Sequence, residues 1–309
     1  MDRSIRLTGS ELVFKLIDEL LVVLERDDEK LFAKRLVDFY MYVEEYRPAS
    51  MAVLNIIKQI AGYLIDHGVR GMNEYLNTLR ESYDNALWRS AEVASRRVLD
   101  DEKIMTNSNS LAVRRLLKIL HDQGKRIEVY TTESRPGREG FRLAEYSESL
   151  GFKTYLIVDS AARFFMKNID KLFVGAEAIA ANGAVVSKIG TSLLALIARE
   201  SRRRVFVIAP SIKFSVESIY GELLRIPEGG IELLIDPEES SEIPEGYVAR
   251  VPIYDVTPSD YIDGIATEYG LIAPQAISLL LRSIHGEYPP SMAQLVSLVN
   301  NIKEKYGVA

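Results

Sequence analysis

The residues best suited to chemistry lie between positions 174 and 191. An apolar strand pattern there ends on Glu177, and a turn with Asn182 follows it. Lys188 comes next, two residues before a Gly–Thr step at which we expect a helix to begin. Free N–H groups at a helix start favour anions, and Lys188 would add a positive charge beside them. A carboxylate this close to an anion site predicts a pocket for a sugar phosphate.

Composition excludes several other kinds of site. The chain has 309 residues and no Cys, so thiol catalysis and cysteine metal centres are ruled out. Its three His residues lack metal-ligand spacing, and neither glycine-rich nucleotide fingerprint follows a strand. We therefore expect no metal and no cofactor. A net charge of -6 argues against nucleic-acid binding. Because no apolar run is long enough to span a bilayer or to form a signal peptide, we expect a cytoplasmic protein with no membrane partner.

The periodicity of apolar residues changes near residue 100. Leucines at helical spacing predict helices through residues 1–100, and strands then alternate with helices to the end of the chain. The predicted strands cover 104–106, 126–131, 154–158, 171–174 and 205–209. Such alternation is typical of a parallel sheet with helices on both faces. We predict an α/β protein with a helical domain, 1–100, before a domain with a mostly parallel sheet, 101–309. An acidic surface loop at 236–245 and a packed final helix at 291–306 complete the prediction.

Each polar residue at a strand end has a structural interpretation beside the functional one. Ser108 follows the first strand, where serine commonly caps a helix. Arg135 could bind a phosphate with two hydrogen bonds or extend into solvent. Glu177 could serve acid–base chemistry, or it could form a structural pair with Lys188. Asp255 fits a structural turn.

Several strings in residues 101–285 resemble one known family. It joins the alpha, beta and delta regulatory subunits of the guanine-nucleotide exchange factor for eukaryotic translation initiation factor two, their archaeal homologues, and two sugar isomerases. The isomerases act on ribose bisphosphate and methylthioribose phosphate. The matching strings are Ile104-Met105-Thr106, Thr132-Glu133-Ser134-Arg135-Pro136, Val158-Asp159-Ser160-Ala161-Ala162, Gly175-Ala176-Glu177, Asn182-Gly183, Lys188-Ile189-Gly190-Thr191, Lys213-Phe214 and Asp255-Val256-Thr257-Pro258.

The resemblance implies a helical domain, a Rossmann-like domain and a pocket between them for a small phosphorylated metabolite, either a sugar phosphate or a nucleotide. It also implies assembly into a homodimer or larger homo-oligomer, and it makes initiation factor two a further candidate partner. The residues implied as ligand contacts are Arg47, Arg135, Asn182, Lys188, Gly190 and Thr191.

Two positions depart from the isomerases. Their catalytic cysteine corresponds to Ser108, and their catalytic aspartate corresponds to Glu177, as in the regulatory subunits. A serine hydroxyl transfers protons poorly without an adjacent base. We therefore expect an archaeal-type regulatory protein that binds its ligand without catalysis. The alternative is an aldose–ketose isomerase that uses Glu177 for acid–base chemistry, with Ser108 positioning the substrate. A third hypothesis is a structural subunit with a vestigial cleft.

Overall fold

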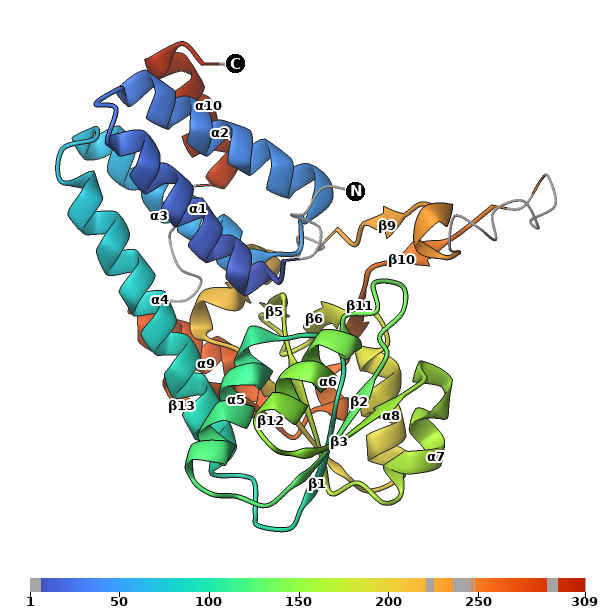
Figure 1. The fold of residues 1–309 in the computed structure, drawn as a ribbon. Coiled ribbons are helices and arrows are strands. Elements are labelled where there is room, and N and C mark those ends of the chain that lie inside the picture. The colour runs from blue at the N-terminus through green and yellow to red at the C-terminus, as the bar shows by residue number, and fades with distance from the viewer. Residues whose placement is uncertain (1–6, 221–224, 236–245, 247, 288–293, 309) are drawn as a thin grey trace.

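The computed structural model describes residues 7–220, 225–235, 246, 248–287 and 294–308. The acidic loop expected at 236–245 lies outside these residues. Within the described residues the chain begins with a layer of helices (Figure 1). These are α1 (Gly9–Leu24), α2 (Glu29–Tyr46), α3 (Met51–His67) and α4 (Met72–Ser95). Thr8 and Glu11 form a reciprocal capping box at the start of α1, which satisfies backbone N–H groups that the helix itself leaves free.

A seven-stranded sheet follows, in the order β13-β12-β7-β4-β1-β2-β3. Neighbouring strands are parallel except β12 and β13, which are antiparallel. This confirms the predicted α/β fold with a mostly parallel sheet. The strands are β1 (Lys103–Thr106), β2 (Glu128–Thr132), β3 (Lys153–Ile157), β4 (Lys171–Gly175), β7 (Arg204–Ile208), β12 (Gly264–Thr267) and β13 (Gly270–Ile272).

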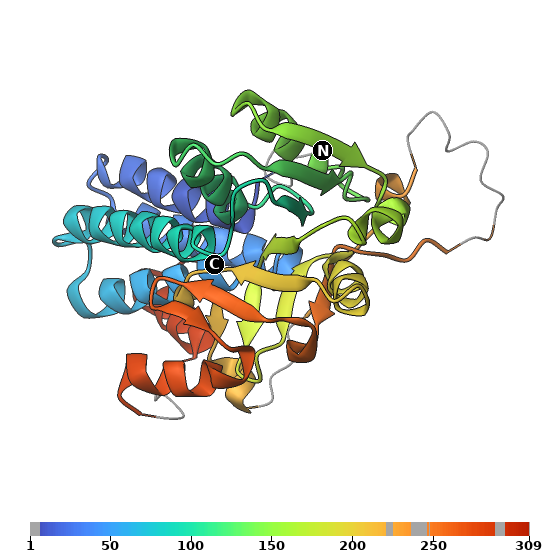
Figure 2. The same ribbon diagram turned by 90° about the horizontal axis from the view of Figure 1, so that it is seen from below.

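Helices cover both faces of this sheet, because alternate residues of its strands are apolar toward each face. Ile104 and Phe173 join the core beneath α4 and α5, whereas Met105 and Leu172 join a second core beneath α7 and α8. Figure 2 shows the two helical layers and the edge pair β12–β13 from below. The helices are α5 (Leu111–Asp122), α6 (Gly140–Ser149), α7 (Ala162–Met166), α8 (Thr191–Glu200) and α9 (Ile277–His285).

A smaller sheet lies beyond β4 and has the order β11-β6-β5-β8. Its strands are β5 (Ala178–Ala180), β6 (Val185–Lys188), β8 (Phe214–Ser215) and β11 (Tyr254–Thr257), and β9 (Glu228–Gly229) pairs separately with β10 (Val251–Pro252). The sequence placed a turn at Asn182 but did not predict the hairpin strands on either side of it. The hairpin brings Lys188 back to the end of the sheet at which Glu177 lies, since Glu177 N–H donates to the Val186 carbonyl at 2.8 Å.

The last helix, α10 (Leu295–Tyr306), returns to the first helices of the chain and packs on α2 and α3 (Figure 1). Ile302 is fully buried there, and the Tyr306 hydroxyl lies 2.9 Å from Glu29 Oε1. One apolar core runs from these helices along α4 to the sheet. The helical layer and the sheet are therefore a single packed body, to which both ends of the described chain contribute.

We expect Ile302→Ala to lower the free energy of unfolding by about 2–5 kcal/mol, since it leaves a cavity between α10 and α3. Val296→Ala on the same helix is the matched control, because Val296 is 56% exposed and its truncation should change stability by less than about 0.5 kcal/mol. Guanidinium chloride unfolding measures both values. Equal small losses would show that α10 contributes little to the core.

Candidate functional site

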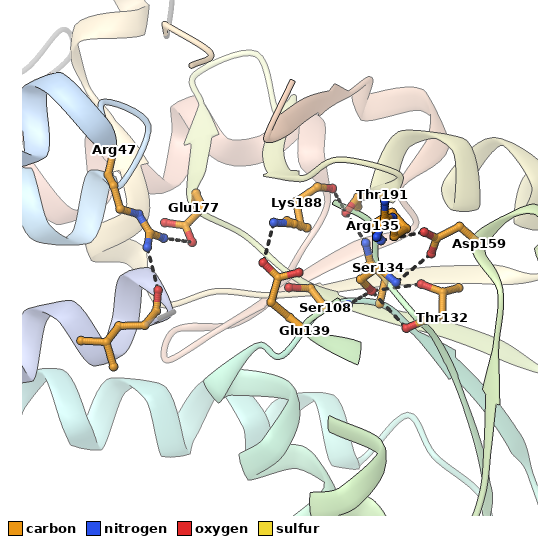
Figure 3. A network of polar contacts seen from close by, with 12 residues as sticks. Arg47, Ser108, Thr132, Ser134, Arg135, Glu139, Asp159, Glu177, Lys188 and Thr191 are labelled. Carbon is orange, nitrogen blue, oxygen red and sulfur yellow. Dashed lines mark hydrogen bonds and ion pairs between the residues drawn. The ribbon is translucent and has the colours of Figure 1, made fainter. Parts of the chain in front are cut away.

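The strand order reverses between β1 and β4. From β1 the chain adds β2 and β3 on one side, and it then adds β4, β7 and β12 on the other. Open parallel sheets bind ligands at the carboxyl ends of the strands on either side of such a reversal. Ser108 follows β1 and Glu177 follows β4, so these two predicted residues lie at that place (Figure 3). The loop after β2, which contains Arg135, ends at the same edge of the sheet.

Glu177 is bound on one side by the helical layer. Its Oε2 accepts a hydrogen bond from the Ser50 hydroxyl at 2.7 Å, and its Oε1 lies 3.4 Å from Arg47 Nη2. The Met51 N–H at the start of α3 donates to the Glu177 carbonyl at 3.2 Å. Side chain and backbone are thus both fixed by residues about 130 positions earlier. Contacts within the protein therefore set the orientation of the carboxylate.

Arg47 acts here as the structural partner of Glu177. It is 8% exposed, and Nη1 donates to the Leu7 carbonyl at 2.6 Å. Burial opposes its charge, but Tyr254 and Glu177 outweigh burial and raise the pKa of Arg47, so the guanidinium stays cationic. Burial also raises the pKa of Tyr254, which therefore stays neutral. The guanidinium thus forms an ion pair with the Glu177 carboxylate, and its predicted ligand contact stays a prediction.

Two further residues contact the segment that contains Glu177. Lys213 is buried, and its Nζ donates to the Ala176 carbonyl at 2.6 Å; burial lowers the pKa of Lys213. Gly9, at the start of α1, faces Glu177 so closely that a Cβ there would lie 2.2 Å from Oε2. Any other residue at position 9 would therefore displace the carboxylate. The sequence analysis assigned no role to Gly9, because nothing local indicates a contact 168 residues away.

Lys188 pairs with Glu139 and not with Glu177, contrary to the structural alternative considered above. Lys188 Nζ lies 2.5 Å from Glu139 Oε1, and the two side chains are 12% and 23% exposed. Glu139 immediately precedes α6, at the end of the loop that follows β2. The sequence analysis missed Glu139 as a site residue, although its place after a matching string at a strand end was an available signal.

The backbone N–H groups at the start of α8 bind the carboxylate of Asp255. The N–H groups of Gly190 and Ser192 donate to Asp255 Oδ2 at 2.8 and 3.1 Å. The Thr191 hydroxyl donates to the Lys188 carbonyl at 2.6 Å. A phosphate bound here would compete with Asp255 for the same donors. Asp255, which was expected in a turn, thus also caps the start of α8, 65 residues earlier in the chain.

Ser108 lies in a strained turn. Its φ of 61° is in the left-handed region, and its N–H donates to the Ser134 hydroxyl at 2.6 Å. The preceding Asn107 side chain donates to the Thr191 hydroxyl at 3.0 Å. Ser108 is therefore attached to the loop after β2 and, through Asn107, to the start of α8.

The two remaining predicted ligand contacts, Arg135 and Asn182, form hydrogen bonds with other parts of the protein. The Arg135 N–H donates to Asp159 Oδ2 at 2.7 Å, and its guanidinium donates to the Leu234 carbonyl. Asn182 is exposed at the tip of the β5–β6 hairpin, at the opposite end from Glu177, and its Oδ1 accepts the Ala184 N–H at 3.0 Å. The predicted ligand contacts of Arg135 and Asn182 stay predictions.

Within the described residues, no group of three or more His, Asp or Glu side chains could bind a metal ion. None of the helices in the described part of the chain is long and apolar enough to cross a membrane. The chemistry available at this edge of the sheet is therefore that of carboxylates, hydroxyls and cations.

Residues 10–274 match the model of the Initiation factor 2 subunit family. The chain belongs to this family. The solved structure of the translation initiation factor eIF-2B from Pyrococcus horikoshii OT3 has a similar fold, with a TM-score of 0.73 and 26% identity over 86% of this chain and 92% of that one. The match agrees with the resemblance that the sequence strings indicated.

Curated relatives in the family are isomerases. Ribose 1,5-bisphosphate isomerase from Methanocaldococcus jannaschii is 34% identical over 280 residues, 88% of each chain. The protein of that name from Archaeoglobus fulgidus is 36% identical over 76% of this chain and 75% of its own length. These relatives contradict the expectation of a non-catalytic regulatory protein, which is therefore wrong. The expectation failed because it rested on two substituted positions alone.

The buried carboxyl of Asp255 should make the free energy of unfolding depend on pH. Burial raises the pKa of its carboxyl from 3.8 to about 6, against the opposing effect of the two N–H donors. Between these values the folded protein binds a proton that the unfolded chain releases. Stability contributed by the protonated form is therefore complete below about pH 4 and is lost as the pH rises through 6.

We expect Asp255→Asn to remove this dependence while its side-chain oxygen still accepts the two N–H groups. Relative to the parent, the variant should gain up to about 3 kcal/mol of stability between pH 4 and pH 8. Denaturant unfolding at both values measures the difference. Parallel stability curves for parent and variant would contradict a raised pKa at this carboxyl. Asp260→Asn, on the 3-10 turn that follows, is the control.

Proposed function

We propose that the protein is a sugar-phosphate isomerase that converts an aldose into a ketose, with a phosphorylated pentose of the ribose 1,5-bisphosphate type as substrate. The observation that supports this most is Glu177, a carboxylate oriented at the reversal of the strand order by Ser50 and Arg47. The names of the relatives at 34% and 36% identity point to the same reaction.

An aldose–ketose conversion moves hydrogen between adjacent carbons, C2 and C1. A carboxylate within hydrogen-bonding reach can take the proton from C2 and return it to C1. Glu177 suits this role because Arg47 compensates its charge, while Ser50 and the backbone contact of Met51 fix its direction. The reach of Glu exceeds that of Asp by one methylene, and acidity is nearly the same.

Ser108 positions the substrate in this proposal. Its hydroxyl is a poor acid–base group without a base beside it, and no contact between Ser108 and a base occurs among the described residues. Its N–H is already used by Ser134 at 2.6 Å. The hydroxyl can therefore form a hydrogen bond with a sugar oxygen.

The phosphate contacts proposed for the substrate are Lys188, Gly190 and Thr191. Gly190 and Thr191 begin α8, where a helix terminus favours an anion, and Lys188 ends β6 just before them. Glu139 and Asp255 occupy the same donors in the structure. Substrate phosphate would displace Asp255 from the N–H groups and would share the Lys188 ammonium, which has three donors, with Glu139.

We also propose that the protein forms a homodimer or a larger homo-oligomer. α7 and α8 expose Phe164, Leu193 and Leu196, apolar side chains that a second copy would cover. Initiation factor two stays a predicted partner.

We expect the parent protein to convert ribose 1,5-bisphosphate to its ketose, followed by NMR. Glu177→Gln should lower kcat by about 10²–10⁴-fold, because the amide cannot carry a proton. Glu177→Asp should keep much more of the rate, and Ser108→Ala should change kcat only severalfold. Glu200→Gln, at an exposed carboxylate of α8, is the control.

Thermal melting with the ketose bisphosphate shows whether each variant still folds and binds. A ligand at a hundred times its Kd raises stability by about 2.7 kcal/mol. The proposal is wrong if the parent converts none of the phosphorylated pentoses tried, whatever it binds.

A further inference from the structure

One oxygen of Glu139 has no partner. Oε1 lies 2.5 Å from Lys188 Nζ, whereas Oε2 is buried and accepts no hydrogen bond from any described residue. A buried carboxylate oxygen without a donor is costly, and such groups gather at functional sites. Glu139 needs only Oε1 to form the ion pair with Lys188. This pairing therefore does not explain why Oε2 is buried without a donor.

The backbone brings Glu139 to the carboxyl edge of the sheet. A Cβ at Gly140 would lie 1.7 Å from the Thr132 carbonyl, so only glycine lets α6 begin so close to the end of β2. Arg138, just before Glu139, has a φ of 56° in the left-handed region. Strain of this kind persists where the surrounding structure enforces it. The loop that leaves the end of β2 thus turns back and places Glu139 close to that same strand end.

Strand β6 joins Glu177 to the Glu139–Lys188 pair. The Glu177 N–H donates to the carbonyl of Val186 at 2.8 Å, and Lys188, two residues further along β6, contacts Glu139. Figure 3 shows Lys188 and Glu139 in the row of polar residues that runs from Glu177 to Ser108. A carboxylate and an amine in direct contact thus lie beside Glu177 at this edge of the sheet.

We propose that Glu139 and Lys188 form the second proton-transferring pair of the isomerase, in a chain that has no cysteine to supply one. This inference rests on the proposed function. Two protons move in an aldose–ketose conversion that opens a sugar ring: one between carbons and one between oxygens. Glu177 serves the carbons, and the Glu139–Lys188 pair serves the oxygens.

The steps balance as follows. Glu177 takes the proton of C2, the C–H electrons form the C1=C2 bond, and the C1–O ring bond breaks. Its electron pair stays on the ring oxygen, which takes a proton from the Lys188 ammonium. The C2 hydroxyl then gives its proton to Glu139 Oε2 and becomes the ketone, while the C1=C2 electrons take the proton of Glu177 to form the new C1–H bond. The proton on Glu139 passes to Lys188 across the 2.5 Å contact, which restores every group.

The test is Glu139→Gln, whose amide oxygen still accepts from Lys188 but cannot take a proton. We expect kcat to fall at least 100-fold and KM to stay within about threefold. The C2 hydrogen of recovered substrate should still exchange with deuterium in D2O, since Glu177 works normally. Glu177→Gln should lose both exchange and turnover. Glu133→Gln, in the same loop, is the matched control.

The outcomes separate this inference from the proposed function. If the parent turns over and Glu139→Gln changes KM but not kcat, Glu139 only neutralises Lys188 and the inference is wrong, with the proposed function intact. Loss of kcat together with loss of C2 exchange would also overturn the division of roles. If the parent shows no turnover, both proposals fail.

Discussion

The buried ion pair of Arg47 and Glu177 is the interaction on which the arrangement of the candidate site depends. Moving two charges out of water is costly unless further hydrogen bonds complete both groups. Here the Leu7 carbonyl accepts a further hydrogen bond from the guanidinium, and the Ser50 hydroxyl donates one to the carboxylate. Because these partners belong to the helical layer and Glu177 to the sheet, one set of contacts both joins the two layers and orients the acid. Removal of either charge would leave the other buried without compensation.

The cations and donors around the start of α8 follow the same rule. Glu139 compensates the charge of Lys188, and Asp255 accepts from the N–H groups of Gly190 and Ser192. A partly buried positive charge is costly unless a negative group balances it, and these two carboxylates supply that balance. The phosphate contact proposed for the Gly190 N–H would therefore have to replace its hydrogen bond to Asp255.

The error about catalysis has a physical explanation. Ser108 and Glu177 were compared with an expected cysteine and aspartate, and the substitutions were taken to abolish the reaction. That comparison considers each position alone, whereas proton transfer depends on every acid and base that the fold brings within reach. Glu139, 38 residues before Glu177 in the chain, was outside the comparison. The tertiary structure pairs it with Lys188, near the start of α8.

The sequence by itself determined the order and type of the main elements and the position of Ser108 and Glu177 at strand ends, since these depend on local apolar periodicity and turn residues. It did not determine the partners of those residues. Arg47 reaches Glu177 across 130 residues, and Gly9 faces the same acid across 168, contacts that arise only when α1 and α3 pack against the sheet. The short strands of the hairpin and the return of α10 were likewise decided by tertiary packing. Burial and long-range hydrogen bonding, not spacing along the chain, select which charges meet.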